Sequence, residues 1–366
     1  MSFIFREPER IAVLRALHLG DLLCATPALR ALRHRFPTAE ITLIGLPWAE
    51  DLMRRLPSVD RLVCFPGYPR VPEVAYSSER SAAFFVEARD ARYDIAIQMH
   101  GDGKLSNGFI AELGAGLTVG YRRLDDDRLT LSLPYVADEP ESLRWLRLVS
   151  LLGAETDDGQ LEFPTAAEVH RARALLAAMP PTGGPLVGLH VGASTPLRCW
   201  PAERFAELAD DLVERWGARI VLTGSETERE LTARVRQSAR APLLDLGGQT
   251  DLGTLTEVIG QLTLLVTNDT SASHLAAVSR TPSVVIFATT QPYQWAPLDR
   301  DRHLVVDART YATPETAPVE ALARLPIEPV LLACERHLAA YSDAAERSPM
   351  PVTPSREPCV PPGASG

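Results

Sequence analysis

Residues 264–287, LLVTNDTSASHLAAVSRTPSVVIF, decide the fold class of this chain. The apolar run at 264–266 predicts a buried strand, and a polar turn at 267–270 follows it. Residues with the apolar spacing of a helix come next until Pro282 stops them, and the apolar run at 284–287 predicts another buried strand. Strand, turn, helix and strand in this order form the repeating unit of a parallel α/β sheet.

The polar turn of this unit contains Asp269 and Thr270 and is a candidate anion site. Ligands of parallel sheets lie beyond the carboxyl ends of the strands, where helix N-termini present N–H groups to phosphates. Both residues are also common helix caps. The turn alone therefore leaves two interpretations open, a phosphate site and a plain helix cap.

The same alternation of strands and helices fills two successive halves of the chain. Residues 180–184, PPTGG, predict a linker between the halves. We expect one domain at 1–180 and a second at 185–340, with a cleft between two facing sheets. The composition of 344–366 is rich in Pro, Ser and Gly, which predicts a disordered tail. The other strands are expected at 10–14, 41–46, 61–65, 93–99, 117–121, 185–191, 218–224 and 243–246.

Caps and prolines set the expected boundaries of several helices. Asp21 and Asp251 stand where helix caps are expected, and Pro201 stands in the first turn of a helix. Pro27 is expected to kink or restart the helix after Asp21, and prolines are expected to break a closing helix at 319–338. Further helices are expected at 79–91, 141–152 and 225–235.

Length, charge and cysteine content bound the class of protein. The chain has 366 residues, enough for two domains, and its net charge of −10 argues against a general nucleic-acid binder. No segment has the pattern of a signal peptide, and no apolar run approaches the ~18 residues of a membrane span. Five scattered cysteines predict reduced thiols in a cytoplasmic protein whose membrane contact is at most peripheral.

Three segments, in order, resemble the heptosyltransferases of glycosyltransferase family 9. Residues 10–45, RIAVLRALHLGDLLCATPALRALRHRFPTAEITLIG, are similar to the family's N-terminal signature. Residues 187–212, VGLHVGASTPLRCWPAERFAELADDL, are similar to the start of its C-terminal domain. Residues 264–297, which extend the opening stretch by ATTQPYQWAP, are similar to its nucleotide-diphosphate segment.

The resemblance implies the GT-B fold, an α/β architecture of two Rossmann-like domains that face each other across a cleft. It implies an inverting glycosyltransferase that moves heptose from ADP-heptose to a sugar hydroxyl without a metal or another cofactor. The N-terminal domain would bind the acceptor and the C-terminal domain the nucleotide sugar. The family's usual acceptor is a glycan or lipid-linked acceptor of the lipopolysaccharide core, with a protein or a small natural product as the alternatives. The expected location is the cytoplasm or the periphery of the inner membrane.

Glycosyl transfer needs a base for the acceptor hydroxyl and stabilisation of the departing diphosphate. The resemblance gives the role of base to Asp21, which can cap its helix and still face a substrate. Arg198 stands where the family usually has Lys before a Trp-Pro step, and a guanidinium can hold phosphate through two N–H groups. Glu226 matches the family's nucleotide-contacting acid. A solvated loop Arg and a first-turn helix Glu remain the structural alternatives.

The turn of the opening stretch matches the family's diphosphate loop. The resemblance places the diphosphate against Asp269, Thr270 and Ser271, with His274 one turn further on. Because Asp269 is acidic, we expect it to hold the loop or the basic residue rather than the phosphate itself. His274 is either part of the site or a histidine satisfied within its own helix.

Two further polar stretches are weighed as sites. His100, Asp102 and Lys104 follow a predicted strand and face the predicted cleft, so they are candidate acceptor ligands or members of a mobile polar loop. Residues 125–127, DDD, match the D-x-D pattern that holds a metal in another glycosyltransferase class. Their arginine neighbours favour a solvated turn, and no metal site is expected.

Departures from the family pattern keep two alternatives open. Ser271 stands where the family usually has Gly, Arg198-Cys199 where it has Lys-Arg, and Phe287-Ala288-Thr289 where it often has Phe-Gly-Pro. A catalytically degenerate protein that binds a nucleotide sugar is one alternative. A nucleotide-sugar epimerase of the same fold is the other, and it would need further acidic and histidine residues beside the nucleotide.

Overall fold

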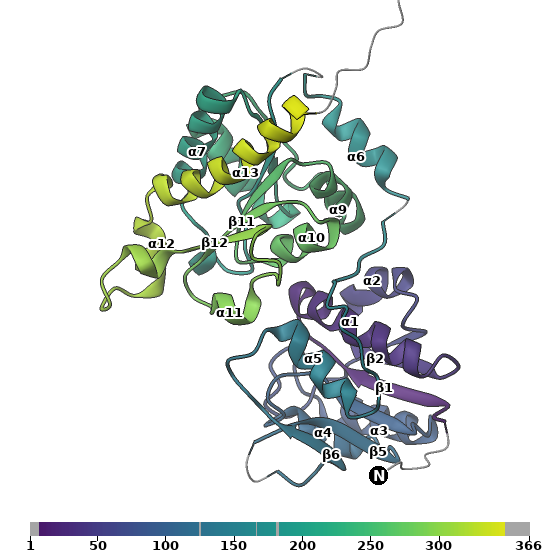
Figure 1. The fold of residues 1–366 in the computed structure, drawn as a ribbon. Coiled ribbons are helices and arrows are strands. Elements are labelled where there is room, and N and C mark those ends of the chain that lie inside the picture. Colours follow the sequence, from purple (N-terminus) through teal and green to yellow (C-terminus); the bar gives the residue numbers. More distant parts are fainter. Residues whose placement is uncertain (1–6, 124–125, 166, 181–182, 348–366) are drawn as a thin grey trace, which may run out of the picture.

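Two six-stranded parallel sheets organise the protein (Figure 1). The structure is a computed structural model that describes residues 7–123, 126–165, 167–180 and 183–347. The strand orders are β3-β2-β1-β4-β5-β6 in the first half and β12-β11-β10-β7-β8-β9 in the second. The direction of the strand order reverses between β1 and β4 in the first sheet and between β10 and β7 in the second. Ligands of such sheets bind beyond the carboxyl ends of the strands at this point of reversal.

The first half contains β1–β6 and α1–α5. The bounds of its elements are β1 Arg10–Leu14, α1 Leu19–Arg35, β2 Glu40–Gly45, α2 Glu50–Arg55, β3 Arg61–Cys64, α3 Ser78–Asp90, β4 Ile95–Gln98, α4 Ser106–Glu112, β5 Leu117–Arg122, β6 Leu131–Pro134 and α5 Glu141–Ser150. Four successive apolar residues of β1 are buried, as expected for a central strand covered on both faces.

The second half repeats this pattern around the stretch that decided the fold class. Its elements are α6 Val169–Leu176, β7 Leu186–His190, η2 Pro196–Arg198, α7 Ala202–Trp216, β8 Arg219–Thr223, η3 Glu226–Glu228, α8 Arg229–Ser238, β9 Leu243–Asp245, α9 Leu252–Gly260, β10 Leu264–Asn268, α10 Ser271–Ser279, β11 Ser283–Phe287, α11 Pro292–Trp295, β12 His303–Asp307, η4 Ala308–Tyr311, α12 Pro318–Arg324 and α13 Ile327–Arg347. The predicted cap of α9 is confirmed, because the Asp251 side chain accepts from the Thr254 N–H.

Pro27 does not restart α1, one of the two outcomes expected for it. The helix runs unbroken from Leu19 to Arg35. A proline lacks the N–H that would donate to the carbonyl four residues earlier, here that of Leu23. The Thr26 hydroxyl donates to this carbonyl at 2.8 Å and so replaces the missing donor.

The C-terminal helices correct two further expectations. The chain breaks at Pro326, between α12 and α13, but Pro329 lies in the first turn of α13, where a proline is tolerated. Helix α13 continues through Arg347, past the expected start of the tail at residue 344. Residues 348–366, the rest of that predicted tail, lie outside the described residues.

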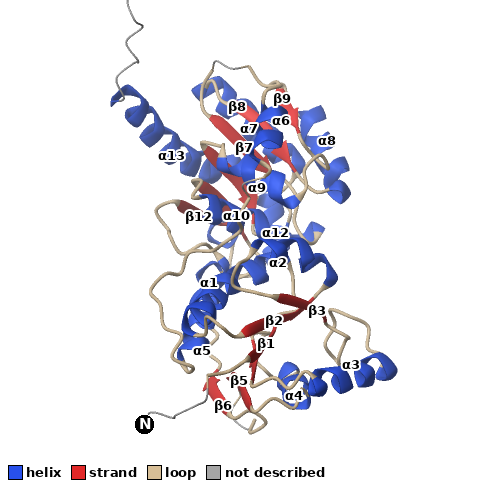
Figure 2. Ribbon diagram, turned by 90° about the vertical axis from the view of Figure 1, so that its right-hand side faces the viewer, coloured by secondary structure: helices blue, strands red, loops and turns tan. Residues whose placement is uncertain are grey.

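The chain crosses from one half to the other earlier than the linker at 180–184 suggests. Helix α6 precedes that linker, yet it packs against α9 of the second half (Figures 1 and 2).

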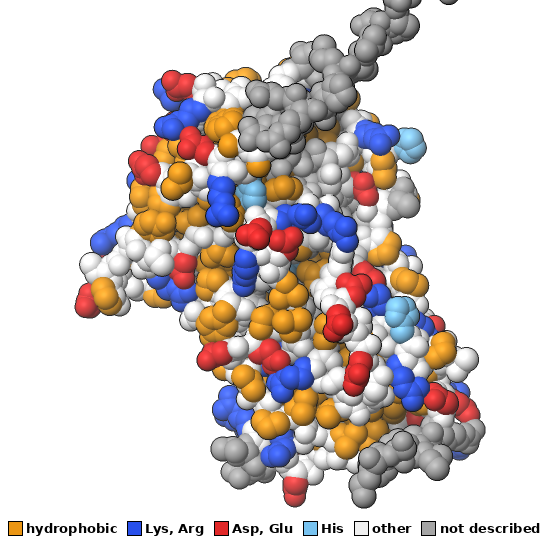
Figure 3. All heavy atoms as spheres, viewed as in Figure 1, with side chains coloured by type: hydrophobic (Ala, Val, Ile, Leu, Met, Phe, Trp, Pro, Cys, Tyr) orange, Lys and Arg blue, Asp and Glu red, His pale blue; other side chains and the backbone are white. Residues whose placement is uncertain are grey.

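Basic and acidic side chains are intermixed over both halves on the face shown in Figure 3. Among the described residues, no helix combines the length and apolarity needed to cross a membrane.

Candidate active site

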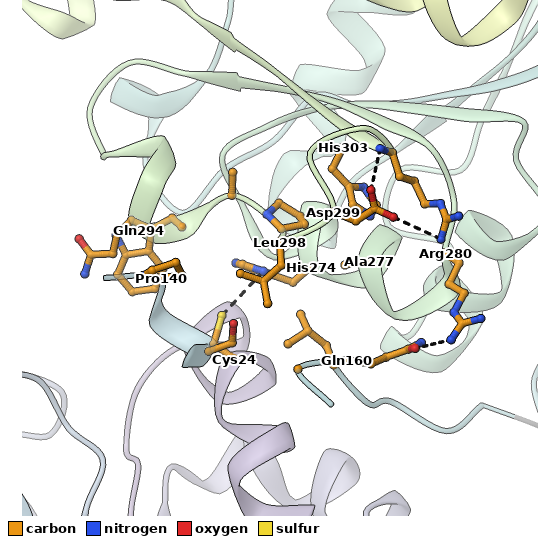
Figure 4. Close-up of a pocket in the computed structure, with 17 residues that line it drawn as sticks. Cys24, Pro140, Gln160, His274, Ala277, Arg280, Gln294, Leu298, Asp299 and His303 are labelled. Carbon is orange, nitrogen blue, oxygen red and sulfur yellow. Dashed lines mark hydrogen bonds and ion pairs between the residues drawn. The ribbon is translucent and has the colours of Figure 1, made fainter. Parts of the chain in front are cut away.

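The halves meet where the first turns of α1 and α10 come together. A Cβ atom added to Gly20 would lie 2.9 Å from Cδ2 of His274, so a glycine permits this close approach. Across the same contact, Cys24 Sγ lies 3.8 Å from His274 Nδ1 (Figure 4). Because α1 follows β1 and α10 follows β10, the carboxyl ends of two inner strands are directed toward one interface.

Asp21 lies in the first turn of α1 beside this interface. The N-cap residue of α1 is His18, so the expectation that Asp21 caps the helix is wrong. Its side chain is 17% exposed. Burial raises the pKa of Asp21, Arg15 opposes that rise, and Glu141 adds to it. A carboxylate with a raised pKa accepts a proton more readily, as a general base requires.

A buried charge network missed in the sequence surrounds Asp21. Nε and Nη2 of Arg15 donate to the main-chain oxygen of Asp21 at 3.0 and 2.8 Å. Nη2 of Arg15 also lies 3.2 Å from Oε1 of Glu141, whose Oε2 accepts from Nε of Arg144 at 3.0 Å. The sequence offers one signal of this network, the charged residue Arg15 directly after the apolar strand β1. Glu141 could not be linked to it, because the two residues are 126 positions apart.

Arg198 and Asp269 lie together on the opposite side of the interface. Arg198 ends η2, is 33% exposed, and places Nη1 3.8 Å from Oδ2 of Asp269. The same oxygen of Asp269 accepts from the Thr290 hydroxyl. Burial raises the pKa of Asp269, and both Thr290 and Arg198 lower it. Asp269 therefore contacts the basic residue, as the sequence led us to expect.

Asn268 fixes the two loops that carry Arg198 and Asp269. Its side-chain amide donates to the carbonyls of Val191 and Gly192 at 2.9 and 3.1 Å, and its oxygen accepts from the Trp200 N–H at 3.0 Å. These bonds join the end of β10 to the loop after β7. Asn268 is a polar residue that ends an apolar strand, but its contacts with the loop after β7 could not be read from the sequence.

The first turn of α10 is uncapped by side chains among the residues described. Thr270 is the N-cap residue, but its side chain makes no capping bond, and the Asp269 carboxylate is engaged with Thr290 and Arg198. The plain-cap interpretation of these two side chains is therefore wrong. Ser271 begins the helix and is partly exposed. An uncapped first turn of this kind can donate backbone N–H groups to an anion.

His274 is buried at the contact between the halves. Burial lowers its pKa to about 4, so its imidazole is neutral near pH 7. A neutral imidazole can exchange a hydrogen bond with a ligand but supplies no positive charge. It lies against Gly20 and Cys24 of the other half, a position that the sequence did not reveal.

Glu226 occupies the first turn after β8, at the outer side of the second sheet. Its side chain is 69% exposed and pairs with Arg229 at 2.9 Å. Its Oε2 would lie 2.5 Å from a Cβ atom added to Gly248, so it stands over a glycine turn. Both interpretations from the sequence, a ribose ligand and a first-turn helix Glu, fit this place.

The three acceptor candidates lie in the loop between β4 and α4, and their environments differ. His100 Nε2 is 3.5 Å from Oε1 of Glu73, and its Nδ1 finds no hydrogen-bond partner among the described residues. Asp102 accepts from Arg123 Nε at 2.5 Å and from the Lys104 N–H at 2.9 Å. The Lys104 side chain is exposed.

Asp126, the middle residue of the D-x-D stretch, is salt-bridged to Arg128. Both Asp126 oxygens accept from Arg128 at 2.7 Å, and Asn107 donates to Oδ2 at the same distance. These bonds lower the pKa of Asp126 to about 2. Asp125 lies outside the described residues. Within the described chain, no group of three or more His, Cys, Asp or Glu residues could hold a metal ion.

A cavity of about 340 Å³ adjoins the α1–α10 contact and has walls from both halves (Figure 4). The first half contributes Cys24, Pro140 and Gln160, and the second contributes α10 and the segment around α11. Arg280 Nη2 donates to Gln160 Oε1 at 2.5 Å across its rim.

Comparison with known proteins assigns this arrangement to a class of enzyme. The family model of glycosyltransferase family 9 (heptosyltransferase) matches residues 82–323, more than half of the chain. The chain therefore belongs to glycosyltransferase family 9, and it is a glycosyltransferase. This confirms the family predicted from the three sequence segments, and it does not favour the degenerate or epimerase alternatives.

Individual relatives agree with this assignment. The chain is 24% identical over 325 residues to lipopolysaccharide heptosyltransferase 2 of Escherichia coli, with 81% of this chain and 87% of the relative covered. A solved family 9 glycosyltransferase from Veillonella parvula superposes with a TM-score of 0.73 at 22% identity, over 91% of this chain and 97% of its own. The E. coli ADP-heptose LPS heptosyltransferase II gives 0.69 at 20%, over 91% and 99%. These structures confirm the predicted GT-B fold.

Proposed function

We propose that the protein is an inverting, metal-independent heptosyltransferase that moves heptose from ADP-heptose to a sugar hydroxyl of the lipopolysaccharide core. The names of its relatives support the donor and the acceptor, since the E. coli relatives are an ADP-heptose LPS heptosyltransferase and a lipopolysaccharide heptosyltransferase. We further propose a cytoplasmic enzyme with, at most, peripheral contact with the inner membrane.

The observation that carries the proposal is the placement of Asp21 and Arg198 on opposite sides of one interface. Asp21 begins α1 of the first half, and Arg198 stands with Asp269 in the second. Burial raises the pKa of Asp269, and the negative charge of Asp21 adds to that rise. A base on one side and a cation on the other are what direct displacement of a diphosphate by a hydroxyl requires.

In the proposed reaction, Asp21 takes the proton of the acceptor hydroxyl as its oxygen bonds to the anomeric carbon of heptose. The bond from that carbon to the diphosphate oxygen breaks at the same time, and ADP leaves with the electron pair. Attack from the face opposite the leaving group inverts the anomeric centre. Arg198 and the first-turn N–H groups at Thr270 and Ser271 would stabilise the charge on ADP.

The remaining candidates receive supporting roles. Asp269 would hold Arg198, Glu226 would accept from the ribose hydroxyls, and His274 would offer a hydrogen bond as a neutral imidazole. On the other side of the cleft, His100, Asp102 and Lys104 would contact the acceptor. Lys104 is the most exposed of these three residues. Asp102 and His100 are already engaged with Arg123 and Glu73.

Calorimetric titration with ADP, UDP, GDP and dTDP, each with EDTA and with Mg²⁺, tests the donor. We expect a preference for ADP that EDTA does not change, followed by heptose transfer from ADP-heptose to a core acceptor. Preference for another nucleotide would reject ADP-heptose as donor. Binding of none of the four would reject the proposed nucleotide-sugar donor.

A further inference from the structure

We propose that Glu141 is a positioning residue for the transfer reaction. Glu141 shares the guanidinium of Arg15 with Asp21 and thereby keeps Asp21 a strong enough base. We further propose that Gln294 extends this network to the second half of the molecule. The inference rests on the proposed role of Asp21 as the base.

The guanidinium of Arg15 is fixed in one orientation. It is fully buried, and Nη1 donates to the Met99 carbonyl at 2.6 Å while Nε and Nη2 donate to the main-chain oxygen of Asp21. Its central carbon lies 4.6 Å from the centre of the Trp145 ring. With these contacts satisfied, Arg15 cannot swing toward either carboxylate without losing several hydrogen bonds.

Two carboxylates share this fixed cation. Nη2 of Arg15 is 3.4 Å from Oδ1 of Asp21 and 3.2 Å from Oε1 of Glu141. Glu141 is itself held, because Nε of Arg144 donates to its Oε2, and Arg144 in turn donates to the Val136 carbonyl at 2.6 Å. The positive charge of Arg15 is therefore divided between two carboxylates.

The charges that face Asp21 set the sign of the effect. On its own half, Arg15 and His18 lower its pKa, while burial and the negative charge of Glu141 raise it. From the other half, Asp269 faces Asp21 and carries Arg198 beside it. Without the charge of Glu141, Arg15 would act on Asp21 alone, and Asp21 would become the weaker base.

Gln294 brings the second half into this network. Nε2 of Gln294, in α11, lies 3.5 Å from Oε2 of Glu141. Figure 4 shows Gln294 beside Pro140, the residue that precedes Glu141. The contact joins α11 of the second half to Glu141, which adjusts the basicity of Asp21. It therefore forms only when the two halves are together.

The experiment measures kcat/KM for heptose transfer against pH in four full-length proteins. Glu141→Gln keeps the shape of the side chain and removes its charge, and we expect the acidic midpoint to fall by about one pH unit, with lower activity on the plateau. Gln294→Lys places a cation beside Glu141 with little risk to folding, and we expect a smaller fall in the same direction. Glu162→Gln is the matched control, because Glu162 pairs with Arg30 and not with the two arginines that hold Glu141.

The outcomes separate the inference from the proposed function. A folded Glu141→Gln protein with the wild-type midpoint would overturn the role of Glu141, and so would an unshifted Gln294→Lys protein if Glu141→Gln did not fold. An equal shift in Glu162→Gln would also overturn it, since the effect would not be specific to the carboxylate that shares Arg15. Absence of transfer in the wild-type protein would instead reject the proposed function.

Discussion

The guanidinium of Arg198 is one-third exposed and lies 3.8 Å from Asp269, so it is kept at the cleft without being fully engaged. This differs from Arg15, which is buried and holds main-chain oxygens. A cation that a carboxylate keeps loosely in place can turn to a phosphate at small cost in side-chain ordering.

We expect Arg198→Ala to weaken ADP binding by roughly 10- to 100-fold, the loss typical of a charge-assisted hydrogen bond. Arg198→Lys should lose less, because it keeps the charge but not the planar fork. Calorimetric titration measures both. Arg204→Ala is the control, because Arg204 pairs with Glu207 on the outside of α7. Equal ADP affinity in wild type and Arg198→Ala would remove Arg198 from the site.

At this scale the sequence predicts residues that belong to motifs and misses those that act through distant partners. Asp21, Arg198 and Asp269 stand in matching segments, and the expected contact between Asp269 and Arg198 is present. Glu141 carries no motif, and its link to Arg15 spans 126 residues. Such a pairing depends on how α5 packs against α1, which local pattern cannot indicate.

At the scale of the elements, α1 shows how one side chain repairs a defect in a helix. The Thr26 hydroxyl donates to the Leu23 carbonyl and accepts from the Glu162 N–H at 2.9 Å. It therefore satisfies a carbonyl orphaned by Pro27 and ties α1 to the segment after α5.

Thr26→Val should lower the free energy of unfolding by about 1–3 kcal/mol, because a buried carbonyl and a part-buried N–H lose their partner. Pro27→Ala in the same background should recover part of the loss, since the alanine has a backbone N–H that can donate to the Leu23 carbonyl. Urea denaturation of the single and double variants measures this coupling. Additive effects of the two substitutions would show that Thr26 does not compensate for Pro27.

Buried strands and capped helices are the elements that the sequence predicts well. The inner strands β1, β4, β7, β10 and β11 were expected because they are continuous apolar runs covered on both faces. The strands β6 and β12, which lie at sheet edges and are only partly buried, were missed, although the edge strands β3 and β9 were expected. The helices α2 and α4 were missed because six or seven residues are too few to show a helical period.

At the scale of the whole molecule, the two halves of the chain predicted from the repeated alternation appear as two sheets (Figure 1). The way the two halves pack against each other could not be predicted from the sequence, because it depends on single contacts such as that of Gly20 with His274. The place of α6 beside α9 has the same explanation, since its packing partner lies more than 70 residues away in the chain.

Gly20→Ala should hold the halves apart, because the added methyl would lie 2.9 Å from the His274 ring. We expect kcat to fall while ADP affinity stays near wild type, and small-angle X-ray scattering with ADP should show a larger radius of gyration. Gly260→Ala is the control, because its added Cβ would make only ordinary contacts with Ser279 at 3.6 Å. Unchanged kcat in Gly20→Ala would show that this close contact is not needed for transfer.

In the proposed mechanism, Asp21 of the first half deprotonates an acceptor while the second half holds ADP-heptose. The most direct test is Asp21→Asn, measured both by calorimetric titration with ADP and by heptose transfer from ADP-heptose. We expect ADP affinity within about twofold of wild type and a loss of at least about 100-fold in kcat, the usual contribution of a general base. Transfer at a rate near that of wild type would contradict the account, because the base would then lie elsewhere.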